Sequence, residues 1–152
     1  MNLLVLSTLR QSKATVKQAL DLAEQDKTKL IILFVVDDVI TNEAISDIKQ
    51  NSFLDRAASQ VVAKVLADEY IERGDRMLLE IAELAEQRGV ASEKILKTGS
   101  LITEVKKITQ EKDINRIIIT KRDRSKFSRL LFGSPLQELQ ESLDIPIDII
   151  EE

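Results

Sequence analysis

The sequence predicts a single α/β domain in which a parallel sheet is covered by helices on both faces. Short apolar runs of strand length alternate along the chain with segments whose apolar residues recur at helical spacing. Such alternation is typical of parallel strands joined by right-handed helical crossovers. The chain has 152 residues, 43% of them hydrophobic, which suits one domain over residues 1–152 with a sizeable core. No linker, internal repeat or low-complexity segment divides it.

The first part of the chain is predicted to form a strand, a helix and a second strand. The first strand covers the apolar run 3–7. Ser12 has the hydroxyl expected of a helix N-cap, and the helix after it has an apolar face made of Val16, Ala19, Leu20 and Ala23. Residues 29–36 are almost continuously apolar, as expected of a strand buried on both faces.

The middle of the chain contains one long helical pattern. Residues 37–52 are polar and mixed, and they predict no element. An apolar stripe at helical spacing then comprises Phe53, Leu54, Ala57, Ala58, Val61, Val62, Val65, Met77, Leu78, Ile81 and Ala85. We expect Gly74 to mark a break or kink within this region and Gly89 to end it.

The last part of the chain is predicted to supply three strands and two helices around a basic loop. The elements, in order, are a weak strand at 93–96, a helix at 101–112, a strand at 116–120, a basic loop at 121–132, a helix at 136–143 and a strand at 145–150. Gly133-Ser134-Pro135 begins the second of these helices, and Gly133-Ser134 can be read as an ordinary turn and helix cap.

The composition excludes several kinds of catalytic and metal site. The chain contains no Cys and no His, which removes disulfides, thiolate nucleophiles, histidine bases and Cys/His zinc sites. Catalysis would have to use carboxylates, lysine, tyrosine or hydroxyls, with Mg²⁺ arriving on a phosphate. Asp37-Asp38 is open to two interpretations, a carboxylate pair for a metal or acid–base chemistry, or a strand end and turn. We favour the turn.

Charge and hydropathy limit the partners. The net charge is -4, and an acidic body argues against nonspecific nucleic-acid binding. The exception is the loop 121–129, which carries five basic side chains against Asp123; it is either a solvated surface loop or an anion-binding segment. The longest apolar run, 30–36, is too short to span a bilayer, and the N-terminus has no signal-peptide pattern. We expect a cytoplasmic protein without membrane contact.

The segment from strand to helix around the basic loop resembles the universal stress protein family. The signature of that family is Gly, two residues, Gly, nine residues and Gly-Ser. Its positions hold Thr120, Asp123, Gly133 and Ser134 here, so the spacing is kept and two of three glycines are replaced. The resemblance covers nearly the whole chain. It implies a Rossmann-like, adenine nucleotide α-hydrolase-like fold whose five parallel strands have the order 3-2-1-4-5.

The resemblance also implies a nucleotide site at the carboxyl edge of strands one and four, which is the general ligand position of open parallel sheets. The family's aspartate at the end of strand one falls on Thr8. The implied cofactor-binding residues are Thr8, Val36, Thr120, Asp123, Arg124, Gly133 and Ser134. A helix start at Gly133-Ser134 can hold an anion.

The replacements at the glycine positions weaken the expected nucleotide binding. Glycine lets a backbone approach phosphates closely with positive φ, and a non-glycine residue there costs about 1–2 kcal/mol. A carboxylate at Asp123 would repel a phosphate within about 4 Å by roughly 1–4 kcal/mol. We therefore predict a regulatory or binding module rather than an enzyme with robust turnover, with no certain cofactor.

Two alternatives remain open. In the first, the chain binds ATP or AMP, with Mg²⁺, through Gly133-Ser134 and the basic loop 121–129, and hydrolyses it slowly. In the second, it is an enzyme of the related adenine-nucleotide α/β group. Resemblance to that group would imply a Gly-rich loop after the first strand. Residues 7–11 contain no glycine, so we rank this alternative last.

The last strand is the expected interface between subunits. Residues 147–150 contain three isoleucines and one acid, and an uncovered apolar edge strand is an aggregation hazard unless it is paired. The family resemblance implies a dimer whose subunits are joined through this strand. We therefore expect a homodimer with Ile147, Ile149 or Ile150 near the interface, and the Phe53–Val65 stripe is the next candidate. A regulatory role is also compatible with a separate protein partner.

Overall fold

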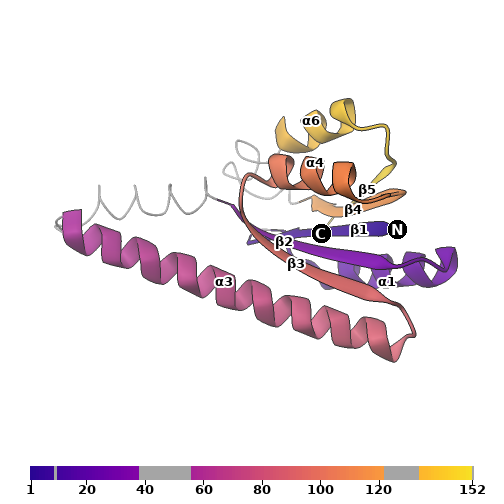
Figure 1. Cartoon of the computed structure of the whole chain (residues 1–152), viewed down its shortest axis with the longest axis horizontal. Coiled ribbons are helices and arrows are strands. Elements are labelled where there is room, and N and C mark those ends of the chain that lie inside the picture. Colours follow the sequence, from indigo (N-terminus) through magenta and orange to yellow (C-terminus); the bar gives the residue numbers. More distant parts are fainter. Residues whose placement is uncertain (9, 38–55, 122–133, 152) are drawn as a thin grey trace.

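Five parallel strands form one sheet in the order β3-β2-β1-β4-β5 (Figure 1). The computed structural model describes residues 1–8, 10–37, 56–121 and 134–151. The strands are β1 (Asn2–Ser7), β2 (Leu30–Asp37), β3 (Ser92–Gly99), β4 (Arg116–Lys121) and β5 (Ile147–Glu151). The expected α/β class and strand order are confirmed.

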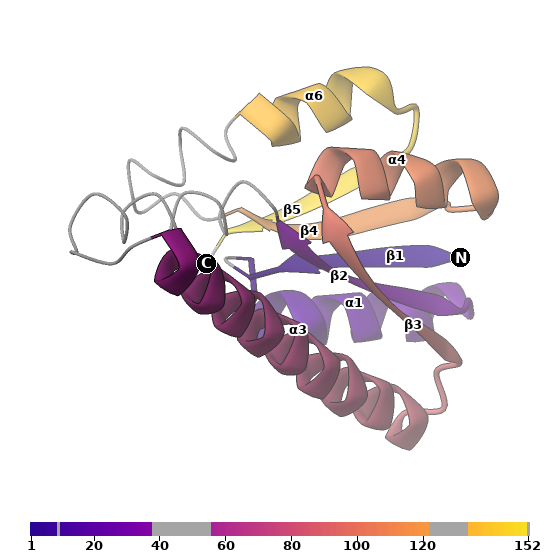
Figure 2. The same ribbon diagram turned by 60° about the vertical axis from the view of Figure 1, so that its left-hand side comes forward.

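Among the described residues, two helices cover each face of the sheet (Figure 2). The helices α1 (Lys13–Asp26) and α3 (Arg56–Gln87) lie on one face, and α4 (Leu101–Glu111) and α6 (Ser134–Ser142) lie on the other. Alternate residues of each central strand enter different cores because successive side chains of a strand point to opposite faces. Leu4 and Leu6 pack under α1 and α3, while Leu3 and Val5 pack under α4 and α6.

The predicted helix ends near α1 and α3 are confirmed. Ser12 is the N-cap of α1, and its hydroxyl accepts a hydrogen bond of 3.4 Å from the Thr15 amide. α3 ends at Gln87, and Gly89 follows with φ of 71°. That left-handed conformation favours glycine and turns the chain toward β3.

Gly74 does not break or kink the long helix, contrary to the sequence prediction. α3 continues through it as one helix of 32 residues. A Cβ atom at this position would lie 2.7 Å from Cδ1 of both Phe34 and Leu96. Gly74 is therefore the point at which the helix backbone approaches β2 and β3 closely, and its role is packing rather than termination.

The ends of two strands and the apolar stripe of α3 also differ from expectation. β3 extends over eight residues instead of four, because its pairing with β2 continues to Gly99. The last strand begins at Ile147 rather than Ile145. Phe53 and Leu54 lie outside the described residues, and Val61 and Val65 are 63% and 59% exposed.

The packed part of α3 is its second half. Leu78, Ile81 and Ala85 are buried against the sheet, whereas the first half extends past the strands (Figure 1). Tyr70 and Ile71, which precede the second half, are partly buried against the same core, so among the described side chains the packing of α3 on the sheet begins near the middle of the helix. Within the described residues, none of the helices has the length and apolar character that a membrane crossing requires.

The close approach at Gly74 yields a stability prediction. Gly74→Ala adds about 1 kcal/mol of helix propensity but overpacks the contact with Phe34 and Leu96, at a cost of about 1–3 kcal/mol. We expect the substitution to destabilise the native protein and to become less harmful when Phe34→Leu is also present. Urea unfolding of the two single variants and the double variant measures this coupling. Equal effects of Gly74→Ala in both backgrounds would contradict the proposed contact.

Candidate functional site

The carboxyl ends of β1 and β4 form the switch point of the sheet. The chain leaves β1 toward β2 on one side, while β4 lies on its other side. The helices that follow β1 and β4 cover opposite faces, and a ligand crevice is expected where the crossovers diverge in this way. Thr8 follows the end of β1, and Thr120 lies one residue before the end of β4. Both predicted residues are therefore at this edge.

Arg10 connects the two strand ends. Its backbone amide donates to the Ser7 carbonyl at 3.1 Å and the Ser7 amide donates to the Arg10 carbonyl at 3.2 Å, which closes a tight turn after β1. The side chain is only 1% exposed. Its Nη1 atom donates a hydrogen bond of 2.6 Å to the carbonyl oxygen of Thr120. The turn thus directs a buried guanidinium across the edge from β1 to β4.

The charge of Arg10 is compensated at the end of β2. Burial lowers the pKa of Arg10 to about 10, and the nearby Asp37 carboxylate opposes that shift. Arg10 nevertheless remains cationic at neutral pH. Asp37 is the last residue of β2 and is 7% exposed. The ends of three neighbouring strands therefore surround one buried cation and one buried anion, and breaking such a pair is costly because the remaining charge stays desolvated.

Two threonine hydroxyls tie the first turn of α1 to β4. The Oγ1 atoms of Thr15 and Thr120 are 2.7 Å apart, and both residues are fully buried. Thr120 thus has its hydroxyl bonded to Thr15 and its carbonyl bonded to Arg10. The residue at the family's first glycine position is engaged within the protein through both its side chain and its backbone.

The remaining predicted site residues are only partly at this edge. The Thr8 hydroxyl is buried and makes no hydrogen bond within the described part of the chain. Val36 precedes Asp37, and its side chain lies in the core under α1 and α3. Ser134 is the first residue of α6. Asp123, Arg124 and Gly133 lie outside the described residues, as does most of the basic loop 121–129.

Sequence reasoning missed Arg10 and Thr15. One signal was present, since Arg10 is the only charged residue in the first twelve. A basic side chain between a buried strand and a helix start can point into solvent or into the protein. The turn between Ser7 and Arg10 determines which of the two occurs, and the sequence pattern does not show that turn. Nothing in the sequence marked Thr15 as a site residue; it lies three residues after the N-cap Ser12.

The carboxylate pair Asp37-Asp38 is described only at its first member, because Asp38 lies outside the described residues. In the residues that the structure describes, no group of three or more acidic side chains is placed to hold a metal ion.

A model of a known protein family matches almost the whole chain. The model of the universal stress protein family matches residues 3–150. Among curated proteins, none matches.

Solved structures of low sequence identity share the fold. The universal stress protein UspA from Lactobacillus plantarum is 14% identical, with 98% of this chain and 97% of that chain covered and a TM-score of 0.69. A universal stress family protein from Burkholderia pseudomallei is 18% identical, with coverage of 98% and 95% and a TM-score of 0.64. A universal stress protein in complex with cAMP is 16% identical, with coverage of 99% and 96% and a TM-score of 0.58.

The hydroxyl pair at the edge yields a second stability prediction. Thr15→Val and Thr120→Val each leave one buried hydroxyl without its partner, at a cost of about 1–3 kcal/mol. The double variant removes both hydroxyls at nearly constant shape, so we expect it to be destabilised by less than the sum of the single changes. Urea unfolding measures the difference, with Thr98→Val on the exposed part of β3 as a control expected to change little. Additive effects would show that the two hydroxyls do not depend on each other.

Proposed function

Because this chain belongs to the universal stress protein family, we propose that it acts as a regulatory or binding protein whose crevice holds adenine nucleotide weakly or not at all. The single observation that carries this proposal is the buried Arg10 side chain, which reaches from the end of β1 to the end of β4 and donates a hydrogen bond of 2.6 Å to the Thr120 carbonyl.

The Arg10–Thr120 bond opposes a ligand at the same edge. A nucleotide that approached the Thr120 backbone at the carboxyl ends of β1 and β4 would have to displace the Arg10 guanidinium from its acceptor. Hydrogen bonds to charged groups contribute about 1.5–3 kcal/mol, and each 1.4 kcal/mol is about tenfold in affinity. Losing this bond without replacement would therefore weaken binding roughly ten- to a hundredfold.

The sequence supports the same conclusion at the glycine positions. Thr120 has a side chain where the family signature has none, and that side chain is held by Thr15. Asp123 would place a negative charge where the signature brings the backbone to phosphates. Like the Arg10 hydrogen bond, both replacements are expected to weaken nucleotide binding, since each hinders close contact between the backbone and a phosphate.

A second candidate function is nucleotide binding by a different set of contacts. A similar fold has been solved with cAMP. In this alternative Arg10 supplies a positive charge to the phosphate, the Thr8 hydroxyl bonds the ligand, and Gly133-Ser134 and the basic loop 121–129 complete the site. The ligand would be ATP or AMP, with Mg²⁺ and slow hydrolysis. The observations that favour it are the buried cation and the Thr8 hydroxyl, which has no hydrogen-bond partner in the described chain.

Calorimetric titration with Mg-ATP separates the two candidates. We expect the native protein to give no saturable binding in the micromolar range. Arg10→Ser opens the crevice and should improve the affinity by about ten- to a hundredfold. Arg73→Ser is the matched control, because Arg73 is exposed and, within the described residues, its ion pair is with Glu69 one helical turn away.

The opposite pattern would favour the second candidate. Low-micromolar binding by the native protein that is lost in Arg10→Ser and kept in Arg73→Ser would mean that Arg10 holds the ligand. Circular dichroism and urea unfolding of both variants are needed beside the titration, because Arg10→Ser leaves the Asp37 carboxylate without a nearby cation.

The proposed assembly is a homodimer joined through β5. Universal stress proteins commonly form dimers. In the described sheet β5 is an end strand that pairs with β4 alone, so its other edge offers backbone groups to a second copy. Ile147 and Ile149 pack partly against the core under α4 and α6, while Ile150 faces the other side. All three are half-buried, which leaves apolar area for an interface.

Sedimentation analysis of Ile150→Lys tests this interface. A lysine at a paired edge would be buried without a partner, so we expect the variant to be monomeric or strongly weakened in association. Thr98→Lys, on the exposed part of the opposite edge strand β3, is the control and should assemble as the native protein does. A folded Ile150→Lys variant that still dimerises fully would place the interface elsewhere, with the Phe53–Val65 stripe as the next candidate.

A further inference from the structure

A groove of about 540 Å³ lies between α1 and α3, and Arg10 is not among the residues that line it. The two helices run side by side on one face of the sheet (Figure 2). The apolar residues along the groove are Val16, Leu20, Met77, Ile81 and Leu84. Its volume is in the range of about 300–1,000 Å³ found for small-molecule sites, which are also mainly apolar.

The apolar part of the groove is open at Leu84. Leu20 and Ile81 form the buried floor, with 3% exposure each, whereas the Leu84 side chain is 44% exposed. Removing the exposed part of an apolar side chain from water is favourable. An apolar chain laid along the groove would therefore gain free energy by covering Leu84 against a floor that is already in place.

Positive charge is concentrated at one end of the groove. Lys13 and Lys17 line it from the first turns of α1, four residues apart and therefore on the same side of the helix. Both are exposed, and the N-terminal end of the α1 dipole adds to their potential. Glu80 is the only carboxylate among the lining residues, so the cations outnumber the anions.

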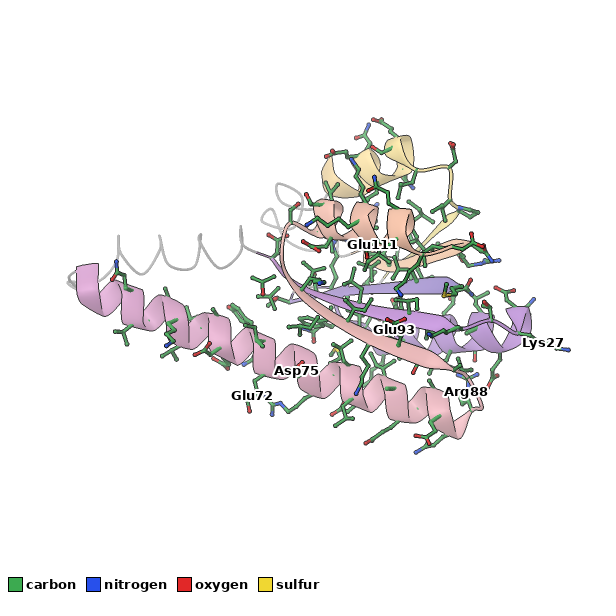
Figure 3. All side chains as sticks on the ribbon, viewed as in Figure 1. Lys27, Glu72, Asp75, Arg88, Glu93 and Glu111 are labelled. Atoms are coloured by element: carbon green, nitrogen blue, oxygen red, sulfur yellow. The ribbon has the colours of Figure 1, made fainter. Side chains whose placement is uncertain are left out.

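The other end of the groove is fixed by ion pairs. Arg88, which Figure 3 labels just beyond the C-terminal end of α3, lines the groove and binds two carboxylates of α1. Its Nε atom is 2.8 Å from Glu24, and it also pairs with Asp21. These pairs hold α1 and α3 together and leave Lys13 and Lys17 as the cations available to a ligand headgroup.

We propose that the groove binds a single-chain alkyl carboxylate. Its tail lies between Leu20 and Leu84, and its carboxylate lies beside Lys13 and Lys17. Seven residues of helix separate Lys13 from Leu20, a rise of roughly 10 Å. That length suits an extended chain of about ten carbons. Its negative headgroup matches the basic end of the groove, and its tail matches the apolar floor.

Calorimetric titration with decanoate tests the proposal on the full chain. We expect saturable binding of one decanoate per protein below the concentration at which decanoate self-associates. Decyltrimethylammonium has the same tail and the opposite charge, and we expect it to bind at least tenfold more weakly. Equal affinity for the two ligands, or no saturable binding of decanoate, would overturn the proposal.

Three variants assign the binding to this groove. Lys13→Gln with Lys17→Gln should weaken decanoate binding about tenfold, since two exposed charge pairs are removed. Lys94→Gln with Lys97→Gln makes the same charge change on exposed β3 positions and should leave it unchanged. Leu84→Gln should weaken both alkyl ligands.

The oligomeric state distinguishes a ligand from a protein occupant. Sedimentation of the native protein and of Leu84→Gln, without decanoate, should give the same mass. If instead Leu84→Gln lowered the mass while decanoate failed to bind, the groove would be an interface between copies of the chain and the proposal would be wrong.

Discussion

The burial of the central strands on both faces is the constraint on which the rest of the structure depends. Every residue of β1 and β2 is buried, so their backbone groups can be satisfied only by neighbouring strands. Helices must then cover both faces, and polar chemistry is confined to the strand ends. Of the buried polar residues in the candidate site, Asp37 and Thr120 lie at strand ends, Arg10 lies in the turn after β1, and Thr15 lies in the first turn of α1. The same constraint that builds the core therefore places the site.

Much of the fold could be predicted from the sequence because it follows from local pattern. The continuous apolar run before Asp37 and the alternation of strands with helices are sufficient for the α/β class. Ser12 and Gly89 act within their own turns, so their roles could also be predicted. Gly74 could not, since its function depends on Phe34 and Leu96, residues that are distant in sequence. A glycine in a helix is ambiguous until the opposing surface is known.

The position of the candidate site could be predicted from the sequence, but the side-chain contacts within it could not. The signature spacing located Thr120, and the order of the strands located Thr8. The contacts that define the edge, from Arg10 to the Thr120 carbonyl and from Thr15 to its hydroxyl, join residues more than a hundred positions apart. No periodicity or spacing encodes such contacts. They depend on β1 and β4 being neighbours and on a turn that directs an arginine inward.

The two halves of α3 differ in how far they pack against the sheet, and this difference affects local stability. A helix of 32 residues is roughly 48 Å long, whereas the longest strands of eight residues span about 26 Å. The half with Leu78, Ile81 and Ala85 unfolds only when the core does. In the other half, Val61 and Val65 are more than half exposed, so among the described residues this part of the helix packs less against the sheet. Amide protons should therefore exchange at rates that rise along α3 toward Arg56, so that one continuous helix spans two different cooperative units.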